Sequence, residues 1–203
     1  MTPSDIETES FAIIDREAGP HAFSPEEWQI VRRMIHTSAD FDYMKSVWFH
    51  PDAISKGIEA IRAGKTIITD TTMAQHGINA PALAPFGCPV ECRIQDPQVG
   101  QKAREAGETR AAAAVDAALS AMTGGIYVIG NAPTALLRLM ERIREGVAAP
   151  ALVIGLPVGF VNAAESKAAL IAMNYPGISN TGRKGGSTIV VSIVNALVRL
   201  AAK

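Results

Sequence analysis

The histidine at position 36 is the side chain whose type and setting best suit acid–base chemistry. It stands in RRMIHTSADFDY (32–43), at the end of a pattern typical of an amphipathic helix with apolar residues at Trp28, Val31 and Ile35. The C-terminal end of a helix favours a protonated imidazole, and an imidazole can give or retrieve a proton near neutral pH. The spacing alone leaves packing open as the alternative to chemistry.

Other common catalytic machinery is not indicated by the sequence. His21, His50 and His76 stand in settings typical of structural or solvated side chains, and their spacing suits no metal site. The CPVEC segment is neither a redox pair nor a zinc half-site, so we interpret Cys88 and Cys92 as small apolar residues in or beside a strand. There is no serine nucleophile elbow, dinucleotide fingerprint or phosphate loop. A lone acid–base group favours proton-assisted rearrangement of a polyanion over redox or metal chemistry.

The elements that must position this histidine alternate along the chain. Short apolar runs, each ending in a small or polar turn, alternate with helical patterns; the runs are KTIITD (65–70), CPVECRI (88–94), GGIYVIG (124–130), APALVIGLP (149–157) and PGISNTG (176–182). Unbroken apolar strands between helices predict a mainly parallel sheet covered on both faces. We therefore expect one α/β domain over residues 1–203, a three-layer α/β/α sandwich with about five strands.

Three helices carry recognisable end signals. The first has Ser24 as N-cap, Pro25 at the first helical position and Glu27 as the capping-box partner. A second is predicted to begin at Pro51 and to close at Gly64. A third, alanine-rich helix is predicted within 107–122.

The turns after the strands are the expected ligand site. In an open parallel sheet, ligands bind in the crevice beyond the carboxyl ends of the strands. GNAPT (130–134) and RKGGST (183–188) place small residues at helix starts, where free amides suit carboxylates or phosphates. Because Gly130, Asn131 and Ala132 precede Pro133, the first helical amides are expected to point back at the crevice. The alternative is that these glycines only satisfy turn geometry.

Bulk properties exclude some partners. The 203-residue chain has a net charge of −1, which argues against a nucleic-acid binder. Its hydrophobic content is 48% but no run approaches a membrane span, and the polar start MTPSDIETES is not typical of a signal peptide. We expect a cytoplasmic protein with no membrane or nucleic-acid partner.

Several longer motifs resemble one enzyme family. The motifs, in chain order, are IHTSADFD, TDTTMAQHGI, GETRAAAAVD, GNAPTALLRL, GLPVGFVNAAESK and GRKGGSTIVVSIVNAL. They are similar to the precorrin-8X methylmutases of cobalamin biosynthesis, and the similarity runs from SFAII at Ser10 nearly to the C-terminus. The resemblance implies an isomerase that moves a methyl group from ring carbon 11 to ring carbon 12 of a contracted tetrapyrrole. It also implies an α/β/α fold, a homodimer with the cleft near the subunit contact, and a polycarboxylate substrate. No separate cofactor is implied, and any cobalt belongs to the substrate.

The resemblance also assigns residues. The essential histidine of the family falls on His36, as proton donor to the macrocycle. Ser10, Arg33 and Arg110 match substrate-contacting positions, with Arg110 suited to a bidentate carboxylate pair. The residues that fall on turns lining the implied cleft are Thr71, Thr72, Asn131, Lys184, Gly185, Gly186 and Ser187. Asp40 and Asp42 are interpreted as structural acids outside the site, at the subunit contact.

Two details refine the resemblance. Asn162 stands where glycine is expected, which bears on the backbone shape of that turn. IHTSADFD, TDTTMA and GRKGGS are more similar to the cobalt-dependent branch, which favours a cobalt-precorrin-8 substrate. Two other classes stay open: a corrinoid carrier that has lost the chemistry, and a flavin or nucleotide oxidoreductase on a similar sheet.

Overall fold

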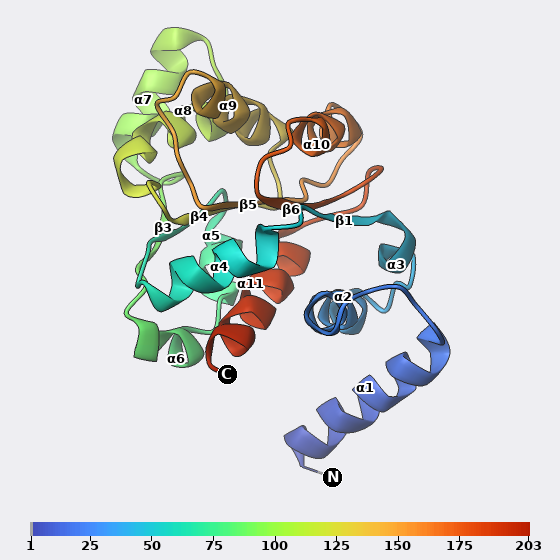
Figure 1. The fold of residues 1–203 in the computed structure, drawn as a ribbon. Helices are drawn as coiled ribbons and strands as arrows, with labels where there is room; N and C mark the ends of the chain where they lie inside the picture. The colour runs from blue at the N-terminus through green and yellow to red at the C-terminus, as the bar shows by residue number, and fades with distance from the viewer. Residues whose placement is uncertain (1) are drawn as a thin grey trace.

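Strands and helices alternate along the chain in the computed structural model, which describes residues 2–203 (Figure 1). The strands of this part are β1 (Val47–Phe49), β2 (Ile67–Thr69), β3 (Val90–Cys92), β4 (Ile126–Ile129), β5 (Leu152–Gly155) and β6 (Gly177–Asn180). The longer helices are α1 (Pro3–Ala18), α2 (Pro25–Ser38), α4 (Ala53–Arg62), α7 (Pro97–Ala106), α8 (Arg110–Ala117), α9 (Pro133–Arg144), α10 (Ala163–Ala172) and α11 (Ser187–Ala201). The shorter ones are α3 (Tyr43–Ser46), α5 (Thr72–Gly77), α6 (Ala80–Leu83), η1 (Ala84–Phe86) and η2 (Leu119–Ala121).

The strands form a single mainly parallel sheet in the order β1-β6-β5-β4-β2-β3. Each pairing is parallel except that of β1 with β6, which is antiparallel. The predicted α/β/α class is confirmed, but the described residues form six strands where about five were predicted. The additional strand, β1, has three half-buried residues at the sheet edge. It pairs only with β6, far along the chain, and no local pattern encodes that pairing.

Successive side chains of the strands point to opposite faces of the sheet and pack into two hydrophobic cores. Ile67, Val128 and Leu152 pack with α11 and α4 on one face, whereas Ile68 and Tyr127 pack with α8 and α9 on the other. Helices α7–α10 cover this second face, as Figure 1 shows. Helix α11 is apolar almost all round and packs between the sheet and α2, which places α2 in the outer part of the first layer.

Helix α1 extends from the body and packs along α2 (Figure 1). Apolar contacts join Phe11 and Ile14 to the α2 residues Val31 and Ile35. None of the helices in residues 2–203 combines the length and apolarity that crossing a membrane requires.

The predicted helix ends are largely confirmed. Ser24 and Glu27 form the capping box of α2. The helix predicted to begin at Pro51 begins instead at Ala53, because the preceding residues form a turn on His50: its carbonyl accepts the Ala53 amide at 2.9 Å, and its Nδ1 accepts the Asp52 amide at 3.1 Å.

Candidate functional site

The carboxyl ends of the parallel strands bring three of the predicted turns together. The Thr71 hydroxyl after β2 lies 2.9 Å from the Ser187 hydroxyl at the start of α11, and it also accepts the Ala74 amide as N-cap of α5. Gly130, after β4, approaches the same point so closely that a Cβ there would lie 2.8 Å from the Ser187 Cα. The turns after β2 and β4 and the turn before α11 therefore share one edge of the sheet.

The backbone amides after β4 are already occupied. The buried Asp70 carboxylate accepts hydrogen bonds from the amides of Gly130 at 3.0 Å, Asn131 at 2.8 Å and Ala132 at 2.9 Å. The amides of this turn are therefore not available to a ligand, because an internal carboxylate occupies them just before α9 begins. Burial raises the pKa of Asp70, and the three amide bonds oppose that rise.

The glycine pair before α11 is required by close packing. A Cβ on Gly185 would lie 2.1 Å from the Leu156 carbonyl oxygen, which accepts the Gly186 amide at 3.0 Å. Gly186 also has a φ of 127°, a conformation that L side chains rarely adopt. The pair seats the turn against the end of β5.

The Lys184 side chain holds the segment that follows α2. Its exposed ammonium contacts Asp40 Oδ2 at 2.5 Å and Asp42 Oδ2 at 2.7 Å. The hydrogen bond from Lys184 lowers the pKa of the Asp40 carboxyl. The interpretation of the two acids as structural agrees with these contacts, which lie within one chain; their charge also means that the Lys184 ammonium is not a free cation.

His36 and Arg33 lie on the exposed last turns of α2, facing α1. The His36 ring centroid is 5.1 Å from that of Phe11, and the Arg33 guanidinium carbon is 5.0 Å from the same ring. Arg33 also pairs with Glu7 at 3.1 Å, and burial lowers the pKa of its guanidinium. Ser10 precedes Phe11 on α1, and its hydroxyl donates to the Ile6 carbonyl at 2.8 Å. The structure thus brings Arg33 and His36 together around Phe11, whereas the Ser10 hydroxyl bonds within its own helix.

A small cavity lies beside Arg33, between α2 and α11. It has a volume of about 240 Å³ and is lined by Arg33 and Thr37 from α2 and by Thr188, Val191, Ser192 and Asn195 from α11. Thr188 directly follows Ser187, so the first turn of α11 links the His36 group to the Thr71 turn.

Arg110 reaches the same edge from the other helix layer. It is the first residue of α8, and the Thr109 hydroxyl before it donates to the Thr134 hydroxyl at 3.0 Å, at the start of α9. Asn131 stands three residues before Thr134 and is exposed. The guanidinium of Arg110 is exposed too and packs over Gly100 of α7. Helices α8 and α9 lie on the face of the sheet opposite α2 (Figure 1).

Sequence reasoning missed Lys167, a fully buried lysine of α10. Its ammonium donates to the Lys184 carbonyl at 2.6 Å and to Asn180 Oδ1 at 3.2 Å. Burial lowers its pKa to about 8. The signal was present in the sequence, because Ala163, Lys167 and Leu170 have the spacing of one helix face, which places a lysine among apolar residues.

The turn after β5 exposes apolar side chains beside the glycine pair. Phe160 and Val161 are 83% and 78% exposed. The Arg183 guanidinium carbon lies 5.3 Å from the Phe160 ring centroid, and the Gly159 amide donates to the Arg183 carbonyl at 3.2 Å. The sheet edge thus offers an apolar surface next to a cation.

Asn162 ends this turn in the left-handed conformation, with φ of 60° and ψ of 5°. Glycine adopts it freely, and asparagine tolerates it better than other side chains do. The departure from glycine therefore leaves the backbone shape of the turn intact.

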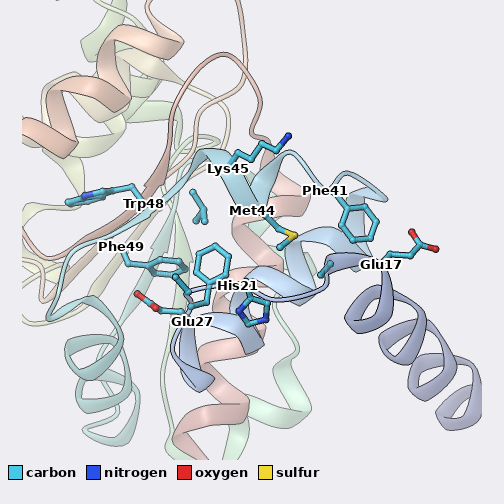
Figure 2. A pocket seen from close by; sticks show the side chains of 12 residues that line it. Glu17, His21, Glu27, Phe41, Met44, Lys45, Trp48 and Phe49 are labelled. Atoms are coloured by element: carbon cyan, nitrogen blue, oxygen red, sulfur yellow. The ribbon is translucent and has the colours of Figure 1, made fainter.

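A further cavity, of about 740 Å³, lies beside the edge strand β1 and contains none of the predicted site residues. Figure 2 shows its aromatic and apolar lining, which includes Phe41, Met44, Trp48 and Phe49. Within residues 2–203, no group of three or more His, Cys, Asp or Glu side chains could hold a metal ion, and Cys88 and Cys92 are free, half-buried thiols.

Comparisons with known proteins agree with the motifs. The precorrin-8X methylmutase family model matches residues 5–200. The chain is 49% identical to a cobalt-precorrin-8 methylmutase of Priestia megaterium, covering 99% of this chain and 89% of the relative, and 41% identical to a precorrin-8X methylmutase of Sinorhizobium sp, covering 94% and 91%. The crystal structure of a precorrin-8x methyl mutase from Thermus thermophilus superimposes with a TM-score of 0.91 at 50% identity, covering 98% of this chain and 96% of that one.

Proposed function

Because the chain belongs to the precorrin-8X methylmutase family, we propose that it moves a methyl group from ring carbon 11 to ring carbon 12 of cobalt-precorrin-8. The product is cobyrinate, the cobalt counterpart of the metal-free product hydrogenobyrinate. The observation that carries this proposal is the match of nearly the whole chain to curated methylmutases. The name of the Priestia relative supports the cobalt-containing substrate. In this proposal the cobalt is part of the substrate, and no separate cofactor takes part.

His36 is the proton donor in the proposed mechanism. Its ring is exposed on the last turn of α2 and touches Phe11 on one side, so a macrocycle can approach the other side. Proton delivery to the ring as the methyl group shifts traps the product tautomer and makes the rearrangement favourable. Arg33, one turn earlier, orients a substrate carboxylate beside it.

The rest of the sheet edge supplies recognition of an apolar ring with carboxylates around it. Arg110 offers an exposed cation, and Arg33, a half-buried guanidinium paired with Glu7, offers a second from the opposite helix layer. Phe160 and Val161 offer an apolar surface between polar turns. Ser10, Thr71, Thr72, Asn131 and Ser187 contribute hydroxyls and an amide. Lys184, Gly185 and Gly186 shape the remaining wall, with the Lys184 ammonium held by Asp40 and Asp42.

The protein is also proposed to act as a cytoplasmic homodimer. The aromatic cavity beside the edge strand β1 supports a subunit contact, because an apolar surface at an unpaired sheet edge is the kind that a second copy covers. Sedimentation equilibrium tests this part, and a monomer at micromolar concentration contradicts it.

A conversion assay tests the proposed reaction. The purified chain is given cobalt-precorrin-8 and, separately, the metal-free substrate, while absorbance follows formation of the corrin chromophore. Catalytic conversion with preference for the cobalt form is expected. Tight binding without conversion would instead identify a carrier. Bound flavin in the purified protein would revive the oxidoreductase alternative.

A further inference from the structure

Lys167 is a buried lysine whose hydrogen bonds go to neutral acceptors. Its exposed fraction is 0%, and its ammonium donates to the Lys184 carbonyl and to Asn180 Oδ1. A buried ammonium with neutral acceptors is expensive compared with an apolar side chain of similar size. Lys167 therefore does not serve to stabilise the core. A role in holding another segment in place explains its presence better.

The object that it holds is the turn between β6 and α11. Asn180 Nδ2 donates to the same Lys184 carbonyl at 3.0 Å and to the Thr181 carbonyl at 3.1 Å. On the opposite side, the Leu156 carbonyl accepts the Gly186 amide. The main chain of residues 181–186 is thus fixed from the protein interior.

The same turn reaches outward to the end of α2. The Lys184 side chain pairs with Asp40 and Asp42, four and six residues after His36, and the Thr181 amide donates to the Ser46 carbonyl at 2.8 Å. Contacts therefore run without a break from Lys167 through residue 184 to the segment that ends the His36 helix.

We propose that Lys167 is a positioning residue: by fixing the Lys184 carbonyl, it sets the 181–187 turn and the 39–42 segment relative to each other, and so places His36 against the turn that receives substrate. The substrate part of this inference rests on the proposed function. Lys167 itself does not touch substrate.

Hydrogen exchange in Lys167→Met tests the placement directly, with the exposed Lys56→Met as matched control. The Gly186 and Asp42 amides, which donate to Leu156 and Asp40, are expected to exchange roughly tenfold faster in Lys167→Met and unchanged in the control. Unchanged exchange at both amides, or faster exchange in α10 and β6 without any change at Asp42, would overturn the proposal. If Lys167→Met does not fold, Asn180→Ala is measured instead, because it removes the other side-chain donor to the Lys184 carbonyl. The Gly186 and Asp42 amides are then expected to exchange roughly tenfold faster in Asn180→Ala.

Ligand binding then tests the consequence. Lys167→Met is expected to bind hydrogenobyrinate roughly tenfold more weakly in an absorbance titration, because small displacements of site groups carry large penalties. Combining it with Lys184→Met should weaken binding no further than the stronger single change does, since both act through one turn. Fully additive losses contradict the proposal. A wild-type chain that neither binds nor converts corrinoids refutes the proposed function, and the exchange result then decides the placement alone.

Discussion

Replacing Lys167 with methionine should change how stability depends on pH. In the folded protein, burial lowers the pKa of Lys167 from 10.5 to about 8. Between these values the unfolded chain binds more protons than the folded one, so the free energy of unfolding rises with pH. Burying the charged lysine lowers the free energy of unfolding at neutral pH, and this destabilisation disappears as pH rises from about 8 to about 10.5.

The size of the effect follows from the shift. At about 1.4 kcal/mol per pKa unit, the full change is roughly 3 kcal/mol, of which about 2.5 kcal/mol falls between about pH 7 and about pH 10. Methionine cannot titrate, so the variant lacks this rise. Tyr127, whose pKa burial raises, and other groups titrate in both proteins and cancel in the difference.

Urea unfolding of wild type and Lys167→Met across this pH range measures the difference. From about pH 7 to about pH 10, the free energy of unfolding of wild type should rise by about 2.5 kcal/mol more than that of Lys167→Met. Parallel pH profiles for the two proteins would refute the reasoning, because they would mean that the ammonium is not desolvated in the fold.

Three further changes probe other parts of the site. Asp70→Ala should lower the free energy of unfolding by about 3 kcal/mol in urea titrations, since it leaves the three amides at the start of α9 without their acceptor; a loss under about 1 kcal/mol would contradict this. Gly185→Ala should raise the KM for substrate, because its Cβ would clash with the Leu156 carbonyl and displace the turn. An unchanged KM with native stability would mean that this turn does not contribute to substrate binding. Phe160→Ala should leave the melting temperature within about 2 °C of wild type and weaken corrinoid binding roughly tenfold, whereas Leu137→Ala, at another exposed apolar residue, should do neither. Equal binding by both variants would remove Phe160 from the ligand surface.

The main frame of the fold could be predicted from the sequence because its signals are local. Five apolar runs gave five of the strands, and Ser24, Pro25 and Glu27 gave the start of α2. Strand β1 was not predicted because its three residues pair only with β6, 129 to 133 positions later, and no local pattern encodes that pairing.

The predicted site residues came from motif resemblance, and the long-range contacts behind them could not be predicted. Asp70 accepts the amides of the turn just before α9, a contact across 60 to 62 positions. The pairing of Lys184 with Asp40 spans 144 positions. Helix-start chemistry predicts that an anion binds, but the tertiary fold decides whether that anion is a ligand or an internal carboxylate.

Turnover by a His36→Ala variant decides whether His36 is the proton donor. The matched control is His76→Ala, because His76 is also an exposed histidine in the last turn of a helix. With cobalt-precorrin-8 as substrate, His36→Ala should keep the fold and the affinity for product but lose conversion by at least about a hundredfold, while His76→Ala stays active. A His36→Ala protein that converts substrate at the wild-type rate would contradict the account.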